Sequence, residues 1–166
     1  MTALFEQLKQ TRTLWILFFV AVPLIFLSKW SQSYWGLMLL DGISDPDAAR
    51  ALLSELTPHQ NQGHLWFTTT LDVILPFAAA GLFASAALNF FGKYGLYLAM
   101  IPLFAVPLDL AEGVVQVLAL TNTADLLEMK SYTTPVKSMC YKIGFLLSLA
   151  GLAKWILLKL KSMVAS

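Results

Sequence analysis

Four long apolar segments constrain this chain more than any other feature of its sequence. They cover residues 13–30, 65–91, 94–120 and 136–160. About 20 mostly apolar residues are enough for an α-helix to cross the hydrocarbon core of a bilayer. Lipid offers no hydrogen bonds, so a crossing segment has to pair its own backbone groups, which a helix does. The sequence therefore predicts an all-α, polytopic membrane protein, a bundle of four transmembrane helices.

The composition agrees with this fold class. Of the 166 residues, 58% are hydrophobic and only 13% are charged, whereas a soluble domain is nearer half apolar and a quarter charged. A net charge of +1 gives no reason to expect nucleic acid as a partner. The single cysteine, Cys140, excludes an internal disulfide and a cysteine metal cluster. We expect one domain, residues 1–166, with no metal or cofactor and with the lipid bilayer as its first partner.

The first apolar segment has two interpretations. Lys9 and Arg12 precede it, and a basic start before an apolar run describes either a signal peptide or a retained anchor. The sequence favours the anchor, because the best cleavage match lies beside a bulky tryptophan. A retained helix would also end in an interfacial belt of aromatic residues. That belt consists of Trp30, Tyr34 and Trp35.

Basic residues predict the orientation of the bundle. With both termini inside, the cytoplasmic side carries six basic residues and one acidic residue, Glu6. The six are Lys9, Arg12, Lys93, Lys154, Lys159 and Lys161. Short cytoplasmic loops are enriched in Lys and Arg. We therefore expect a multi-pass protein of the bacterial inner (plasma) membrane with both termini in the cytoplasm.

The first outer loop contains a short helical pattern, "SDPDAARALLSEL". Asp45 can cap the helix, and Pro46 suits its first position. Leu52, Leu53 and Leu56 would then lie on one face. This predicts an amphipathic helix on the outer surface, which either covers the bundle or acts as a lid over a site. The following "HQNQGH", with His59 and His64, is expected to be a solvated loop.

Three acids lie inside the apolar segments. Asp109 and Glu112 are three residues apart, so they share one helix face. At about 1.5 Å per residue, Glu112 lies roughly 12 Å below the outer end of its segment and Asp72 roughly 10 Å below. Lys142 lies in the fourth segment at a similar depth and is the expected counter-charge. The predicted polar cluster is Asp72, Asp109, Glu112, Lys142, Gln116, Thr69 and Tyr141.

This cluster allows two interpretations. An ionisable residue inside a membrane is a functional candidate by default. The alternative is a buried network of ion pairs and hydrogen bonds that fixes the geometry of the bundle. Pro76 and Pro107 lie close to the acids and can kink their helices. Small residues four apart, such as Ala80 and Ala84, allow close helix packing, within the bundle or against another copy or a membrane-complex partner.

The motifs "LDVILPF" and "LDLAEG" resemble those of an uncharacterised group of small bacterial four-span membrane proteins. In that group an Asp-x-x-x-Pro in the second span meets an Asp-x-x-Glu-Asn in the third; this chain has Gly113 in place of the Asn. A fainter resemblance is to the EXPERA fold of sterol isomerases and sigma-2-type receptors. That resemblance implies a helical cavity in which Asp72, Asp109 and Glu112 hold a cationic or sterol-like ligand.

Four functions remain open at this point. The leading one is binding of a lipid or of a small amphipathic or cationic ligand at the acid cluster. The second is an isomerase-like enzyme acting on a lipid, whose catalytic residues the sequence does not identify. The third is movement of protons or cations, and the fourth is a structural or assembly subunit of a membrane complex. No nucleophile elbow, zinc-protease motif or phosphate-binding loop is present.

Overall fold

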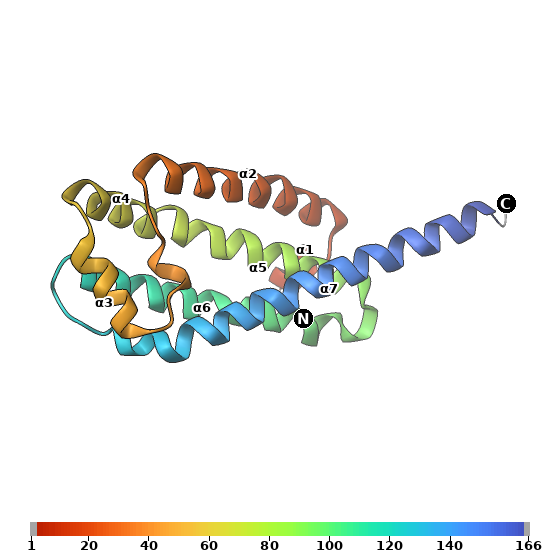
Figure 1. Ribbon diagram of the computed structural model, residues 1–166. Helices are drawn as coiled ribbons and strands as arrows, with labels where there is room; N and C mark the ends of the chain where they lie inside the picture. The colour runs from red at the N-terminus through yellow and green to blue at the C-terminus, as the bar shows by residue number, and fades with distance from the viewer. Residues whose placement is uncertain (1–2, 165–166) are drawn as a thin grey trace.

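The computed structural model describes residues 3–164 and is helical (Figure 1). Short helix α1 (Ala3–Leu8) precedes α2 (Thr11–Trp35). A 3-10 turn, η1 (Leu40–Gly42), leads to α3 (Pro46–Glu55), α4 (Pro58–Thr69) and α5 (Leu71–Phe90). The turn η2 (Gly92–Tyr94) joins α5 to α6 (Gly95–Leu120), and η3 (Leu127–Met129) precedes α7 (Lys130–Val164). No strand occurs in this described part of the chain.

The predicted four-helix membrane fold is confirmed. Four helical stretches of the described residues are long and apolar enough to cross a membrane. They are Thr11–Trp35, Pro58–Phe90, Gly92–Leu120 and Leu127–Leu158. Helix α5 lies between α2 and α6, and α7 packs across α5 and α6 before extending past the other helices (Figure 1).

Two of the four stretches, those that begin at Pro58 and Leu127, start well before the segments that the sequence predicted. The segment expected as a loop around His59 and His64 is helix α4, because Thr57 and Gln60 form a capping box and Pro58 occupies the first turn. A break at Thr70, with φ −120° and ψ −79°, separates α4 from α5. Helix α7 begins at Lys130 rather than near residue 136. Both differences bring polar residues that were expected in loops into the bundle.

The amphipathic helix predicted in the first loop is confirmed as α3. The Asp45 carboxylate accepts a hydrogen bond from the Asp47 backbone N–H at 3.2 Å, which caps the helix. Its apolar face covers one end of the bundle and contacts a buried cluster. The cluster and its partly buried neighbours include Leu40, Ala49, Val115, Leu120, Leu127, Leu52, Leu53 and Leu56. We call this end of the bundle the α3 end, and the opposite end, with α1 and η2, the α1 end.

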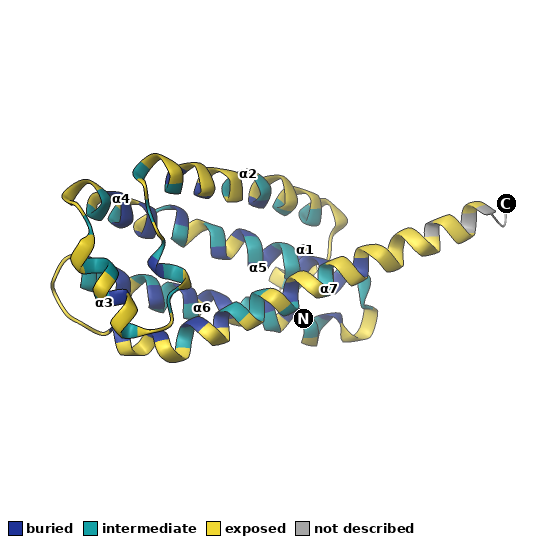
Figure 2. Ribbon diagram, viewed as in Figure 1, coloured by how far each residue is buried: buried dark blue, intermediate teal, exposed yellow. Residues whose placement is uncertain are grey.

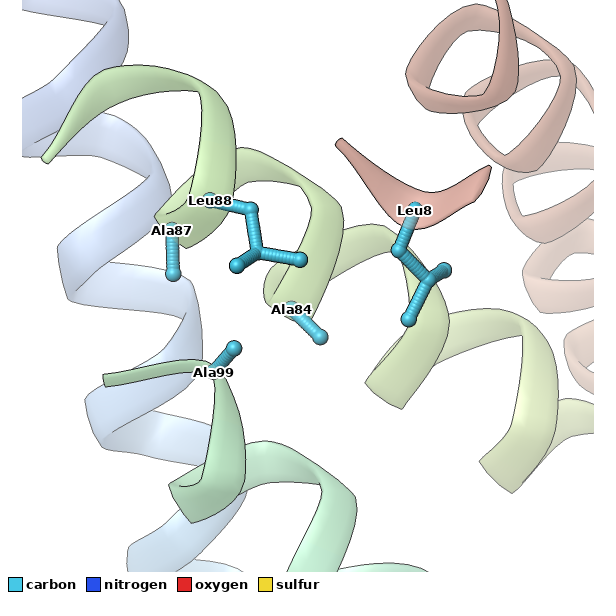
Figure 3. Packing of buried hydrophobic residues seen from close by; sticks show 5 residues of the cluster. All are labelled: Leu8, Ala84, Ala87, Leu88 and Ala99. Carbon is cyan, nitrogen blue, oxygen red and sulfur yellow. The ribbon is translucent and has the colours of Figure 1, made fainter. Parts of the chain in front are cut away.

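Small residues hold α5 against α6 at the α1 end. Figure 3 shows Ala84, Ala87 and Ala99 facing one another, with Leu88 and Leu8 beside them. A Cβ atom on Gly95 would lie 2.8 Å from the Ala87 carbonyl oxygen. The backbones of the two helices therefore meet too closely for a larger residue there. In this chain the Ala80 and Ala84 side chains are used for internal packing, because both are fully buried.

The outward faces of α2 and α7 are exposed and apolar. Figure 2 shows buried residues concentrated on α4, α5 and α6, whereas α2 and the far part of α7 are mostly exposed. On α2 the exposed side chains include Trp15, Phe19, Phe26, Trp30 and Tyr34. Bulky apolar side chains facing outward on a helix of this length suit contact with lipid.

Candidate functional site

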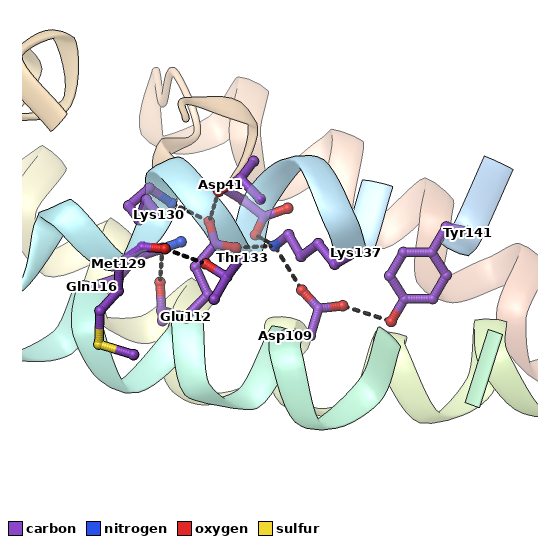
Figure 4. A network of polar contacts seen from close by, with 11 residues as sticks. Asp41, Asp109, Glu112, Gln116, Met129, Lys130, Thr133, Lys137 and Tyr141 are labelled. Carbon is purple, nitrogen blue, oxygen red and sulfur yellow. Dashed lines mark hydrogen bonds and ion pairs between the residues drawn. The ribbon is translucent and has the colours of Figure 1, made fainter. Parts of the chain in front are cut away.

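The two acids of α6 are buried on its face toward α7. Glu112 is 1% exposed and Asp109 is 6% exposed. Buried carboxylates are stable only when cations and hydrogen-bond donors surround them. Their partners come from α7 and from η1, as Figure 4 shows.

Glu112 has three partners, all on α7. One carboxylate oxygen pairs with the Lys130 ammonium and accepts a hydrogen bond from the Thr134 hydroxyl at 2.8 Å. The other oxygen lies 3.0 Å from Lys137 Nζ. Lys130 is itself fully buried. Glu112 therefore neutralises a lysine that has no access to solvent.

Asp109 and Asp41 meet Lys137 from opposite sides. Lys137 Nζ lies 2.7 Å from Asp109 Oδ1 and pairs with Asp41, which η1 carries into the bundle. The Tyr141 hydroxyl donates to the second Asp109 oxygen at 2.6 Å. One ammonium group thus contacts three carboxylates, counting Glu112 (Figure 4). Five residues form this charge cluster: Asp41, Asp109, Glu112, Lys130 and Lys137.

The sequence prediction that Lys142 neutralises the acids is wrong. Lys130 and Lys137 do so, and Lys142 makes no ion pair or hydrogen bond with any residue that the structure describes. Helix positions 130, 134, 137 and 141 recur every three or four residues and share one face of α7. Residue 142 is rotated from that face by about 100°. This spacing was the available signal, but Lys130 precedes the fourth apolar segment, where a charged residue is expected in a loop.

The predicted threonine is also displaced by one position. Thr69 is exposed and donates to the Leu65 carbonyl of its own helix at 2.7 Å. Its neighbour Thr68 is buried and donates to Gln116 Oε1 at 3.4 Å. Gln116 Nε2 and His64 Nε2 are buried and have no hydrogen-bond partner among the described residues.

Asp72 differs from the other acids. It lies in the first turn of α5 and is half-buried. Its carboxylate makes no ion pair or hydrogen bond within the described part of the chain. Asp72 instead lines a cavity that Asp109 and Tyr141 also line. Asp72 therefore faces the cavity, whereas Asp109 and Glu112 form ion pairs with lysines.

The cavity has a volume of about 410 Å³ and lies between α5 and α7. Its polar lining consists of Asp41, Asp72, Asp109, Thr134, Lys137, Ser138, Tyr141 and Lys142. Its apolar lining is a strip along α5: Leu75, Pro76, Ala79 and Phe83. These α5 positions recur every three or four residues, so they share the face that carries Asp72. The cavity thus has an apolar wall on α5 and a polar wall formed mainly by α7 and η1.

The formal charge around the cavity is negative. Three carboxylates meet two ammonium groups in the charge cluster, and Asp72 adds a fourth acid. Lys142 on the cavity wall offsets one of these charges. A cationic group entering the cavity next to Asp72 would therefore be attracted, and it would replace a missing counter-charge.

Arg50 fixes α3 to the loop before α7. Its guanidinium contacts Asp47 at 3.0 Å, Asp125 at 2.7 Å and Glu128 at 3.0 Å. The hydrogen bond from Arg50 holds the pKa of the Asp125 carboxyl below its usual value. Asp125 is exposed, so water screens this interaction and its contribution to stability is small. The contact orients α3 over the end of the bundle where the charge cluster lies.

Among the described residues, no group of three or more His, Cys, Asp or Glu side chains is arranged to hold a metal ion. The acids of the charge cluster are already paired with Lys130 and Lys137. Comparison with protein-family models, with curated proteins and with solved structures finds no match for this chain. The functional interpretation therefore depends on the geometry of the charge cluster and of the cavity beside it.

Proposed function

We propose that this protein binds an amphiphilic molecule in the cavity between α5 and α7, with a cationic group of that molecule against Asp72. The observation that carries the proposal is the Asp72 carboxylate, which faces the cavity and is the one acid there that no described lysine or arginine contacts. An ionised carboxylate in a low-dielectric setting is costly without a counter-ion. A bound ammonium group would supply one.

The shape of the cavity supports an amphiphile rather than a small inorganic cation. Its apolar strip extends along α5 from Leu75 to Phe83. Ligand pockets of this size are typically apolar with a few placed polar groups that orient the ligand. An alkyl chain would lie along this strip while its head group stays beside Asp72.

Asp72→Asn is expected to weaken binding of dodecylamine by at least about tenfold, because losing one favourable charge contact of about 1.4 kcal/mol has that effect. The measurement is the concentration of dodecylamine that raises the thermal unfolding midpoint of the purified protein. Dodecanol, which has the same chain and no charge, is expected to stabilise the wild type less.

The matched control is Glu55→Gln, which neutralises an exposed acid on α3 away from the cavity. It is expected to respond to dodecylamine as the wild type does. Equal stabilisation of the wild type and of Asp72→Asn by dodecylamine would contradict the proposed function. Both variants should unfold near the wild-type temperature without ligand, because neither residue is paired inside the bundle.

We further propose that the α3 end faces away from the cytoplasm in a bacterial inner membrane. Lys9, Arg12, Lys93 and Lys154 gather at the α1 end, where Ser85 Oγ donates to the Leu8 carbonyl and Phe90 packs against Gly151. Positive charge favours the cytoplasmic side. Green fluorescent protein fused to the C-terminus is then expected to fluoresce, and alkaline phosphatase inserted after Asn122 is expected to be active. The opposite pair of results would reverse this orientation.

A further inference from the structure

Lys142 is the second charged residue of the cavity that has no partner within the described residues. It lies on α7, lines the cavity and is exposed. Two residues further along α7, Gly144 packs against Phe83 of α5 and Pro102 of α6, with a contact of 3.0 Å for a Cβ placed there. Pro102 lies two turns inside α6, which begins at Gly95. Lys142 therefore begins deep in the membrane-spanning region, where an unpaired ammonium group is costly.

The register of α5 and α7 places Asp72 and Lys142 at different depths. Phe83 packs against Gly144 and Phe90 packs against Gly151, so the two helices run in the same direction in matched steps. Asp72 lies eleven residues before Phe83, and Lys142 lies two residues before Gly144. At about 1.5 Å per residue, their backbones are about 13 Å apart along the bundle. Because a helical side chain leans toward the N-terminus of its helix, Lys142 leans along the cavity toward the α3 end.

The cavity therefore has a defined order of chemical groups. From the α3 end inward, the charged groups of its lining that have no partner among the described residues are the carboxylate of Asp72 and then the ammonium group of Lys142, and the apolar strip of α5 runs beside them to Phe83. A zwitterionic phospholipid has the complementary order from its polar end: an ammonium group, then a phosphate diester, then acyl chains. A simple amine would neutralise Asp72 alone, and a fatty acid would neutralise Lys142 alone.

We infer that the amphiphile is a zwitterionic phospholipid, whose ammonium group contacts Asp72 and whose phosphate contacts Lys142. This inference rests on the proposed function and adds the second charged contact to it. A volume of about 410 Å³ holds the head group and the first part of the chains. The remaining length of the chains then leaves the cavity between α5 and α7 and joins the surrounding lipid.

Native mass spectrometry of the purified protein with three probes tests this inference. Dioleoylphosphatidylethanolamine carries both charges, dioleoylphosphatidylglycerol has the phosphate without the amine, and dodecylamine has the amine without the phosphate. We expect the wild type to bind the phosphatidylethanolamine most tightly. Lys142→Gln is expected to weaken that binding at least about tenfold while changing dodecylamine binding by less than about twofold.

Two further lysine variants make the comparison specific. Lys142→Arg keeps the positive charge and is expected to retain most of the phosphatidylethanolamine binding. Lys29→Gln removes an exposed lysine of α2 outside the cavity and is expected to change binding of none of the probes. An effect of Lys29→Gln equal to that of Lys142→Gln would show nonspecific attraction at the membrane surface and would overturn the inference.

The outcomes separate this inference from the proposed function. If Lys142→Gln binds phosphatidylethanolamine as the wild type does, or if phosphatidylglycerol binds equally tightly, the zwitterionic assignment is wrong while amine binding at Asp72 stands. If Asp72→Asn binds dodecylamine as the wild type does, the proposed function itself fails. The proposed function and this inference are both supported if phosphatidylethanolamine binds more weakly to Asp72→Asn and to Lys142→Gln, and if dodecylamine binding is retained only in Lys142→Gln.

Discussion

Lys137→Met is expected to lower the free energy of unfolding by about 3–5 kcal/mol, the range measured when one partner is removed from a buried ion pair. Lys137 is 4% exposed, and its ammonium group contacts Asp41, Asp109 and Glu112. Methionine has a similar length, so the packing of α7 is retained while three carboxylates lose their shared cation. Their mutual repulsion then adds to the cost of burying them.

This expectation can be measured by equilibrium unfolding in mixed micelles containing sodium dodecyl sulfate, followed by circular dichroism. Adding Asp109→Asn to Lys137→Met should recover part of the loss, because it removes one of the stranded charges. Lys29→Met, on the exposed face of α2, is the control and should stay close to the wild type. A stability of Lys137→Met equal to that of this control would mean that the charge cluster does not hold the bundle together.

Glu112→Gln is expected to lower the free energy of unfolding by a similar amount, because it leaves a buried cation, rather than buried carboxylates, without a partner. It leaves Lys130, which is fully buried, without a carboxylate partner. An unpaired ammonium group in that position should cost about 3–5 kcal/mol of unfolding free energy. The same unfolding measurement applies, with Glu55→Gln as the matched control on the exposed surface of α3.

The double variant Glu112→Gln/Lys130→Met distinguishes charge burial from loss of shape. Replacing both members of a buried pair is often nearly neutral, because no isolated charge remains. We therefore expect the double variant to be more stable than Glu112→Gln alone. If the second substitution instead adds a further loss, the Lys130 side chain matters for its packing rather than for its charge.

These variants separate two roles that the sequence left open for the same acids. Glu112 and Asp109 are committed to lysines, and Tyr141 donates to Asp109, so they belong to a network that fixes α6 against α7. Asp72 forms no ion pair with a described residue and faces the cavity. Substituting Glu112 should therefore reduce stability, whereas substituting Asp72 should reduce binding with little change in stability.

Much of the fold could be predicted from the sequence because lipid imposes simple rules on length and hydropathy. The four membrane helices and the amphipathic helix α3 follow from apolar length and from the Asp45-Pro46 start. The early start of α7 could not be predicted in this way. Lys130 is charged, so hydropathy assigns it to water, and only its contact with Glu112 explains its burial.

The candidate site was partly predictable for the same reason. Depth along a helix follows from residue counting, so Asp72, Asp109 and Glu112 could be assigned to one region of the membrane. Rotation about the helix axis does not follow from counting alone. Lys142 is next to Tyr141, which donates to Asp109. Thr69 is next to Thr68, which donates to Gln116. The role of Asp41 depended on η1 folding into the bundle, which no local pattern indicates.

Photo-crosslinking tests the central claim most directly, namely that an amphiphile occupies the cavity with its cationic group at Asp72. A dodecylamine analogue with a diazirine on its chain would be irradiated with the protein in nanodiscs, and the labelled peptides would be mapped by mass spectrometry. The account predicts labels on the α5 strip from Leu75 to Phe83 and on α7 near Lys142, and a clear reduction of both in Asp72→Asn. Labels confined to the outward face of α2, or equal labelling of the cavity in Asp72→Asn, would contradict it.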